Sequence, residues 1–484
     1  MNKYKHAFGK NDIRGIYGED ITEELFYRTG RAFVKWLQKQ SGKPPGEMYI
    51  TVTTDARTHS PSLRDALNKG IASTGANVVN LGLAPTPVGY YSEAAGLPKE
   101  LTGGKDVIAA LIITASHNPK EYNGLKMTYG KMTLNELQIK EVYEEVKNLK
   151  IEESPGGFGK IKEFDILPDY LREMKSQFGH TGKGIKVVVD SANATGGVIG
   201  PEIYKEIGCE VVELFSEPDG TFPNHHPNPS DVKTLDTLKK TVVKEKADLG
   251  IAFDGDSDRI GVVDSAGNYI TGDKLLLIYA LDLIEQGLKP VVVSEVKCSQ
   301  VLYDTVNRLG GNAVMCKTGH GYIKSRMKET NAVLAGEMSG HTFFKDRYYG
   351  FDDAIYAGCR IIEIIAKHKK INPDFKIQDM LKPFSEVYSS DEVRFPCPND
   401  KKKSVLEKVK AQIENDRKIF GSPISEIITL DGMRIIFNGG FALIRQSNTE
   451  PVFTLRFEAR TKDECERFQK IMLGMLEKAV RQAG

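Results

Sequence analysis

The stretch IKVVVDSANATGGVIGPEIYKEIGCEVVELF (185–215) contains one complete strand–helix–strand unit. An apolar strand ends at an acidic residue, a helix follows near 198–207, Gly208 makes a turn, and a second apolar strand begins at Cys209. Continuous Val and Ile runs indicate strands that are buried on both faces of a sheet. Because strand–helix–strand alternation is typical of parallel layers, this stretch predicts an α/β module.

Two other segments repeat the pattern. MYITVTTDAR (48–57) precedes a helix near 61–74 and the strand NVVNLG, and PVVVSEVKCS (290–299) precedes a helix near 300–308 and the strand NAVMC. The units lie too far apart for a solenoid, whose repeats are roughly 20–50 residues long. We therefore predict three similar α/β domains with mixed sheets in series.

The C-terminal part has a different pattern. Short strands are expected in MRIIFN, GFALIR and VFTLRFEA within 430–460, followed by an amphipathic helix near 462–482. This predicts a smaller α+β domain. Linkers are expected at 150–168 and at 371–398, the latter rich in Pro, Ser and Asp. The expected domains are 1–160, 161–275, 276–383 and 384–484.

The composition is that of an ordinary globular protein. Of the 484 residues, 40% are hydrophobic and 27% charged, and 66 Lys+Arg against 65 Asp+Glu give a net charge of +1. This balance gives no support for nucleic-acid or membrane partners. The six cysteines form no CxxC pair, and the apolar run 107–113 is too short to span a membrane. We expect a cytoplasmic protein, a monomer or homodimer.

A first candidate loop follows a predicted buried strand in IITASHNPKEYNGLK (112–126). It presents Ser116, His117 and Asn118 where α/β proteins place ligands, with Lys126 ten residues beyond the serine. An ordinary Ser/Asn/Pro turn is an equally good interpretation of this segment alone.

A second loop follows the strand LGIAF and carries Asp254, Asp256 and Asp258, with Arg259 beside them. Three carboxylates this close repel one another unless a cation neutralises them, and oxygen ligands favour a hard cation such as Mg²⁺. An EF-hand is excluded because Arg259 stands where it needs Gly. A solvated acidic turn is the alternative.

Two further loops could hold a phosphorylated sugar. LAGEMSGHTFF (334–344) offers Glu337 and Ser339 for neighbouring hydroxyls, with His341 in the same loop. RQSNTEP (445–451) offers a guanidinium, two hydroxyls and an amide, which suit a phosphate dianion, although a polar hairpin is the simpler alternative. Lys297 and His320 stand at predicted strand ends of the third module.

Taken together, these motifs resemble the α-D-phosphohexomutase superfamily, and within it the phosphomannomutase/phosphoglucomutase group. TASHNP, DGDSDR, GEMSGH and RQSNTEP occur in the family order, and FGKNDIRG and FPNHHP are also family-like. The resemblance spans nearly the whole chain and implies four domains around a central cleft. Ser257 departs from the family pattern, where Gly is common. Met338 resembles the mannose and glucose mutases, whereas Gln at this position is more typical of phosphoglucosamine mutases.

The resemblance also implies residue roles. Ser116 would be the phosphorylated serine, and its phosphate would share Mg²⁺ with Asp254, Asp256 and Asp258. Cleft residues that stabilise phosphate charge or move protons would be Arg14, Lys126, Arg259, Lys297 and His320. Sugar hydroxyls would be held by Glu337 and Ser339, with His341 in the same substrate-binding loop, and the non-reacting phosphate by Arg445, Ser447, Asn448 and Thr449.

The expected reaction is phosphoryl transfer between a phosphoserine and a hexose monophosphate through a hexose 1,6-bisphosphate, which also serves as activator. Lys126 is the first candidate for the general base, provided that its pKa is depressed, and His117 is the second. The alternatives are a phosphoglucosamine mutase, a non-catalytic sugar-phosphate-binding homologue, and a Mg²⁺-dependent phosphatase with an Asp nucleophile.

Overall fold

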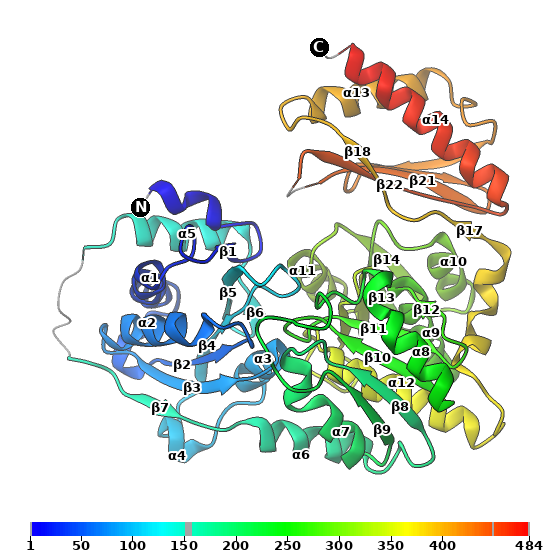
Figure 1. Ribbon diagram of the computed structural model, residues 1–484. Helices are drawn as coiled ribbons and strands as arrows, with labels where there is room; N and C mark the ends of the chain where they lie inside the picture. The colour runs from blue at the N-terminus through cyan, green and yellow to red at the C-terminus, as the bar shows by residue number, and fades with distance from the viewer. Residues whose placement is uncertain (1, 151–156, 448–449, 483–484) are drawn as a thin grey trace. The chain divides into compact units, whose positions relative to one another are not determined.

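The computed structural model describes residues 2–150, 157–447 and 450–482 (Figure 1). The chain forms two compact units, Met1–Thr271 with Ser339–Ile377, and Gly272–Met338 with Gln378–Gly484. Among the described residues, no helix is both long enough and apolar enough to cross a membrane.

The first sheet of unit 1 is mixed. β2 runs parallel to β3 and β4, β7 parallel to β3, and β1 and β5 are antiparallel to their neighbours. The carboxyl ends of β2 and β4 therefore meet at one edge. In spatial order the strands are β1 (Ile13–Ile16), β5 (Tyr122–Tyr129), β4 (Val107–Ile113), β2 (Tyr49–Thr54), β3 (Asn77–Leu83) and β7 (Ile161–Glu163), with β6 (Met132–Thr133) paired to β5.

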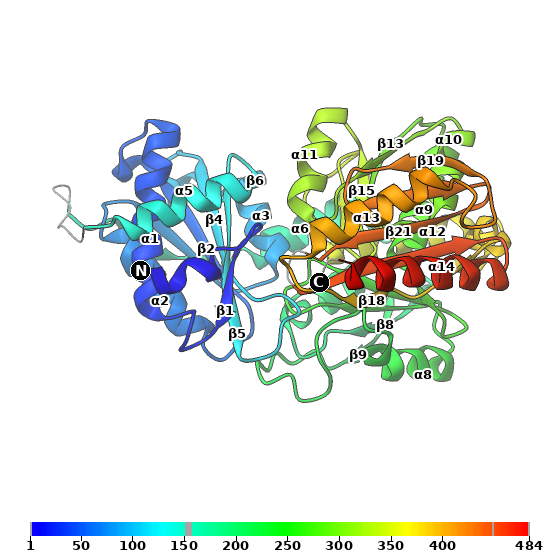
Figure 2. The ribbon, with the colours of Figure 1, turned by 90° about the horizontal axis from the view of Figure 1, so that it is seen from above.

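Helices cover both faces of this sheet. Alternate residues of β2 and β4, such as Val52 and Leu111, face the apolar core formed with α1 (Glu23–Ser41), α2 (Ser60–Ala72) and α5 (Glu136–Lys147). Figure 2 shows α1 beside α5 on that face. The other alternate residues, such as Ile112, face α3 (Thr86–Ala94). The short helices are η1 (Asn2–Ala7), η2 (Pro45–Glu47) and α4 (Lys99–Thr102).

The second sheet of unit 1 has the order β12 (Tyr269–Ile270), β11 (Ile260–Asp264), β10 (Leu249–Phe253), β8 (Lys186–Asp190) and β9 (Glu210–Leu214). β8 is parallel to β9 and β10, whereas β10 and β11 form an antiparallel hairpin. The remaining elements of this part are α6 (Leu167–Phe178), η3 (Thr195–Val198), α7 (Gly200–Glu206), η4 (Val232–Leu235), α8 (Asp236–Glu245), β16 (Thr342–Phe344) and α12 (Ala354–Lys369).

Unit 2 contains the third α/β module and the C-terminal domain. In the module, β13 (Val291–Glu295) runs parallel to both β14 (Asn312–Cys316) and β15 (Leu334–Gly336). Its helices are α9 (Gly272–Glu285), α10 (Gln300–Arg308) and α11 (His320–Thr330). All three predicted strand–helix–strand repeats are therefore confirmed.

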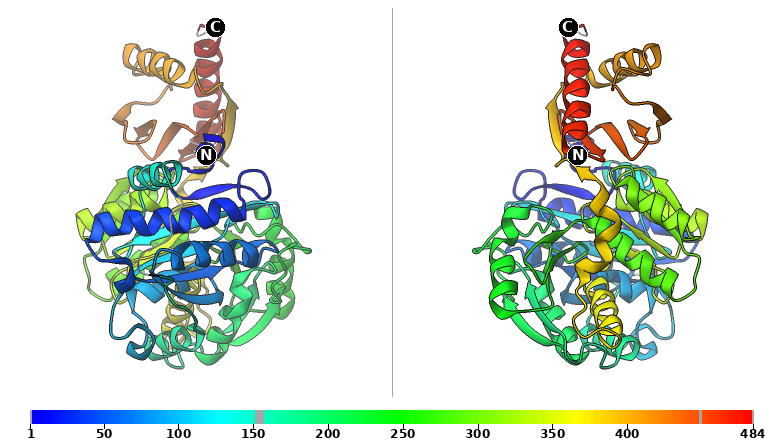
Figure 3. Two further views of the ribbon diagram at one scale, coloured as in Figure 1. Left: turned by 90° about the vertical axis from the view of Figure 1, so that its left-hand side faces the viewer. Right: turned by 90° about the vertical axis from the view of Figure 1, so that its right-hand side faces the viewer.

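The C-terminal domain is an antiparallel sheet with both of its helices, α13 (Lys402–Asn415) and α14 (Lys462–Arg481), on one face (Figure 3). The predicted α+β class is confirmed. The strand order is β17 (Tyr388–Ser389), β22 (Val452–Ala459), β21 (Gly440–Gln446), β20 (Met433–Phe437) and β19 (Ile424–Ile428), with β18 (Val393–Pro396) also paired to β22.

The expectation of a linker at 371–398 is wrong from residue 377 onward. This segment forms η5 (Ile377–Glu386), β17 and β18. Val393 and Phe395 pack against the apolar core of the domain, and Pro396 lies at the end of its strand, where a missing N–H is tolerated. In the first expected linker, 150–168, residues 151–156 lie outside the described residues, and the remainder contains β7 and the first residues of α6 joined by irregular segments.

A buried carboxyl group in the first module makes its stability depend on pH. Glu93 of α3 is 4% exposed and accepts hydrogen bonds from Thr128 Oγ1 and from the backbone N–H of Lys131. Burial, only partly offset by these hydrogen bonds, raises the pKa of Glu93 to about 7. The folded state therefore binds more protons than the unfolded state between about pH 4.3 and 7, so the stability contributed here falls as pH rises through that window.

Glu93→Gln removes this titration while keeping an acceptor for Lys131. We expect the unfolding free energy of wild type to fall relative to Glu93→Gln by up to about 3 kcal/mol from pH 4.5 to 8. Urea unfolding followed by circular dichroism measures the difference. The exposed Glu100→Gln is the control and should run parallel to wild type. Parallel curves for Glu93→Gln as well would contradict the prediction.

Candidate functional site

The loop after β4 holds Ser116 in an unusual backbone conformation. Ser116 is 3% exposed and has φ +50°, in the left-handed region that non-glycine residues rarely adopt. Its N–H donates to Thr114 Oγ1 at 2.8 Å. Its hydroxyl donates to Asp254 Oδ2 at 2.8 Å and lies 3.1 Å from His117 Nδ1. The structure thus brings the serine of the first module directly against the acidic loop of the second.

The acidic loop joins β10 to β11. Asp254, Asp256 and Asp258 are each at most 1% exposed, and one carboxylate oxygen from each lies within 4.8 Å of the other two. Among the described residues, Asp256 Oδ1 is buried without a hydrogen-bond partner. An all-oxygen donor set with an unsatisfied buried oxygen fits a hard divalent cation, so these residues are able to hold a metal ion.

The carboxylates also repel one another. Burial, followed by the charges of Asp258 and Asp256, raises the pKa of Asp254 well above its usual range, against the opposing effect of Arg259 and Lys126. A divalent ion would relieve both the repulsion and the cost of burial.

Lys126 lies in β5, the strand after the serine loop, and is 4% exposed. Its Nζ is 2.6 Å from Asp256 Oδ2 and also pairs with Asp258. Burial opposes protonation of the amine, but the two carboxylates outweigh it and raise the pKa of Lys126 well above its ordinary value. This pairing favours the charged ammonium form of Lys126, whereas a role as base needs a depressed pKa.

The surroundings of His117 shift its pKa in the opposite direction to that of Lys126. The charge of Arg259, with burial next and Arg14 third, lowers the pKa of His117 well below its ordinary value. The imidazole is therefore neutral at pH 7 and is able to accept a proton.

Two arginines complete the positive side of the site. Arg14, from β1, donates to the Asn118 side chain at 2.8 Å and to the Ala115 carbonyl at 3.2 Å. Arg259 lies 3.9 Å from Asp254 Oδ2, and its Nε donates to His341 Nε2 at 3.0 Å. Both are placed beside the serine loop or the acidic loop.

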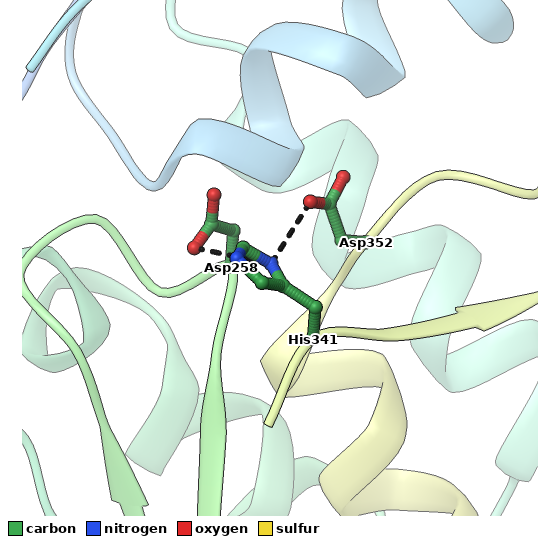
Figure 4. Close-up of side chains that lie close together, drawn as sticks. All are labelled: Asp258, His341 and Asp352. Atoms are coloured by element: carbon green, nitrogen blue, oxygen red, sulfur yellow. Dashed lines mark ion pairs between the residues drawn. The ribbon is translucent and has the colours of Figure 1, made fainter. Parts of the chain in front are cut away.

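His341 is held between two carboxylates (Figure 4). Its Nδ1 lies 3.0 Å from Asp352 Oδ2 and 3.6 Å from Asp258 Oδ1. Since Nε2 accepts from Arg259, the ring proton is on Nδ1 and faces these carboxylates. Sequence reasoning missed Asp352, because an acidic pair directly before a helix is also typical of an N-cap, the role that Asp353 has in α12.

The predicted sugar and phosphate residues of unit 2 also cluster. Glu337 accepts from the backbone N–H of Gly319 at 2.8 Å, which ties it to the loop of His320. The unpredicted Glu295 is fully buried; it accepts from Thr318 Oγ1 and from the N–H of Met338. Lys297 Nζ lies 3.7 Å from the same carboxylate.

The loop of RQSNTEP is fixed from two sides. Arg445 pairs with Asp431 at 3.2 Å, and Lys402 donates to the carbonyl of Ser447 at 2.9 Å. Asn448 and Thr449 lie outside the described residues. Ser339 belongs to unit 1, where its carbonyl accepts from Ser230 at 2.9 Å. The GEMSGH motif is therefore divided between the two units, since Glu337 and Met338 belong to unit 2.

Comparison with known proteins agrees with this geometry. Models of phosphoglucomutase/phosphomannomutase α/β/α domains I, II and III match residues 5–153, 168–267 and 271–383, and the C-terminal domain model matches 392–474. The chain is 37% identical to a phosphomannomutase/phosphoglucomutase of Pseudomonas aeruginosa, over 97% of this chain and 95% of that protein. It is also 37% identical to a phosphoglucomutase of Neisseria meningitidis, over 98% of both.

A solved structure gives the same result. The crystal structure of a phosphoglucomutase/phosphomannomutase family protein from Burkholderia thailandensis superposes with a TM-score of 0.87 at 34% identity, over 98% of this chain and 97% of that one. These matches define the class of the protein, the phosphohexomutases, which are isomerases. The chain belongs to the phosphoglucomutase/phosphomannomutase family.

The acidic loop predicts cation binding. We expect MgCl₂ to raise the thermal midpoint of the wild-type protein, because a ligand that binds only the folded state stabilises it. Asp256→Asn removes a charge at the unsatisfied oxygen and should weaken binding at least about tenfold, measured by isothermal titration calorimetry. The exposed Asp65→Asn is the control and should bind like wild type. Equal Mg²⁺ affinity for Asp256→Asn would exclude this loop as the site.

Proposed function

We propose that the protein interconverts hexose 1-phosphate and hexose 6-phosphate, with mannose or glucose as the sugar, through a phosphorylated Ser116. The observation that carries the proposal is the 2.8 Å hydrogen bond between Ser116 Oγ and Asp254, two residues of different modules that meet in a buried site. The activities named for the relatives, phosphomannomutase and phosphoglucomutase, support the same function.

The reaction consists of two phosphoryl transfers. In the first, the bond between Ser116 Oγ and phosphorus breaks, a bond forms between phosphorus and the free hydroxyl of the hexose monophosphate, the hydroxyl loses its proton, and Ser116 Oγ gains one. The product is a hexose 1,6-bisphosphate, which is the intermediate and the activator. In the second transfer the other phosphate returns to Ser116 by the reverse steps.

The positive groups around the serine serve this chemistry. Phosphoryl transfer spreads negative charge over the transferring oxygens, so positioning and charge stabilisation dominate catalysis. Asp254, Asp256 and Asp258, with the Ser116 phosphate, would hold Mg²⁺, which would supply positive charge. Arg14 and Arg259 add fixed guanidinium groups beside the loop, and Lys126 adds an amine paired with Asp256 and Asp258.

His117 is the group proposed to exchange the serine proton. Its Nδ1 lies 3.1 Å from Ser116 Oγ, within hydrogen-bond reach of the atom that gains and loses the proton. His341, fixed by Asp352 and Arg259, lies beside the same trio.

The remaining predicted residues are proposed to bind substrate. Lys297, His320, Glu337, Ser339 and His341 would hold the sugar, and Arg445, Ser447, Asn448 and Thr449 its non-reacting phosphate. Because the two transfers need opposite ends of the sugar at Ser116, the contacts to its hydroxyls must accept both orientations.

Ser116→Ala tests the covalent route. Intact mass and phosphosite mapping of wild type should show phosphate on Ser116, and a coupled assay with glucose 1-phosphate or mannose 1-phosphate, primed with glucose 1,6-bisphosphate, should show turnover. Ser116→Ala should lose at least about 10³-fold in kcat, since no acceptor oxygen remains. The exposed Ser62→Ala is the control.

The outcomes separate the alternatives. Full activity of Ser116→Ala would refute the phosphoserine. Net phosphate release with an acid-labile acyl phosphate would indicate a phosphatase, and preference for glucosamine 6-phosphate would indicate a phosphoglucosamine mutase.

A second prediction concerns Gly255, between two of the aspartates. A Cβ at Gly255 would lie 2.2 Å from the Ser116 carbonyl oxygen, so any side chain must displace the serine. We expect Gly255→Ala to lower kcat about 10²-fold, because misplacement by about 1 Å has such an effect. Gly46→Ala, at an exposed position with no atom within 4 Å, should leave kcat unchanged. Normal turnover in Gly255→Ala would show that the serine position tolerates movement.

A further inference from the structure

We infer that Arg57, a residue at the end of β2 that contacts no proposed substrate group, is the positioning residue that fixes the backbone of Ser116. Its side chain is fully buried. Nη2 donates to the carbonyls of Ser116 at 3.0 Å and Asn118 at 2.6 Å, and Nη1 donates to the carbonyls of Pro119 at 2.6 Å and Tyr122 at 3.2 Å. One guanidinium therefore holds four carbonyls of the serine loop.

The loop needs such a partner because its backbone is strained. A non-glycine residue in the left-handed region persists only where its surroundings impose that conformation, and Ser116 has φ +50°. Its carbonyl is held between Arg57 Nη2 and the close approach of Gly255. These contacts set the direction in which the hydroxyl leaves the chain, toward Asp254.

Arg57 is itself fixed by Asp55. The carboxylate accepts from Arg57 Nε at 3.0 Å and from the N–H of Ala115 at 3.3 Å, and it also accepts from the Ser60 hydroxyl at 2.6 Å. The end of β2 is thereby joined to the end of β4. On its other side the guanidinium faces the ring of Phe222, at 5.2 Å, in the FPNHHP segment of the second module.

Lysine cannot replace this arrangement. The planar guanidinium presents five N–H groups in a fixed fork, and all of its nitrogens are used here, whereas an ammonium has three donors at one point. Arg57→Lys keeps the positive charge but leaves carbonyls of the loop without a donor. A role that is only structural would lower stability, whereas a positioning role also slows transfer from Ser116 in the folded protein.

The test rests on the proposed function and uses the full chain with Mg²⁺ and phosphorylated Ser116. Single-turnover transfer of the phosphoryl group to glucose 6-phosphate should slow about 10²-fold in Arg57→Lys, and steady-state kcat should fall equally with KM within about threefold of wild type. The control is Arg31→Lys, a buried arginine of the same module that donates to Ser73 and Tyr27. The Arg31→Lys variant should transfer the phosphoryl group at the wild-type rate even if its melting temperature is lower than that of wild type.

Asp55→Asn provides a second variant if Arg57→Lys fails to fold. It keeps one acceptor oxygen but loses the second oxygen and the charge that orient Arg57, and we expect about a tenfold slower transfer. Folded, phosphorylated Arg57→Lys or Asp55→Asn with the wild-type transfer rate would overturn the positioning role and leave the proposed function intact. Absence of phosphate from Ser116 in the wild-type protein during turnover would instead remove the proposed function.

Discussion

The mutual repulsion of three buried carboxylates is the constraint on which the rest of the site depends. The tight loop of the β10–β11 hairpin carries Asp254, Asp256 and Asp258. Their side chains are buried at the end of β10, where water cannot screen their charges. Unpaired charges in such a place would destabilise the fold. Three surrounding groups partly compensate these negative charges: the ammonium of Lys126, the nearby guanidinium of Arg259, and the hydroxyl of Ser116, which donates a hydrogen bond.

The same constraint explains why the two modules of unit 1 meet where they do. Lys126 and Ser116 come from the first module, and the carboxylates that they contact come from the second. Thr86, at the start of α3, adds another bond of this kind to Asp256 at 2.7 Å. Binding a cation and joining the two modules are therefore parts of one electrostatic arrangement, and substitutions in the trio are expected to affect both.

Much of this was predictable from the sequence. Apolar runs predicted the strands β8, β10 and β13, and the polar residues after such runs predicted the loops that carry Ser116 and the aspartates. These features were predictable because strand periodicity and chain order are local properties. The strands β17 and β18 were missed because their pairing with β22 is nonlocal and Pro and Ser obscure it.

The sequence also could not predict which side chains contact one another within the site. The pKa of Lys126 follows from which carboxylates face it, and the roles of Arg57, Glu295 and Asp352 follow from carbonyls and side chains that are distant in sequence. A buried Arg after a strand has the same local pattern as an exposed one. The residues proposed to act on substrate were recognisable from local composition, whereas the residues that contact and fix them were not.

The pairing of Lys126 with the three aspartates has a consequence for the proposed phosphorylation of Ser116. Phosphorylating Ser116 adds about two negative charges next to carboxylates that Lys126 only partly neutralises. The demand for a cation at the acidic loop would therefore be greater in the phosphorylated chain than in the unmodified one. Under the proposed function, occupancy of the ion site and phosphorylation of Ser116 would be linked equilibria, each strengthening the other by the same factor, so the phosphorylated chain would bind the cation more tightly than the unmodified chain.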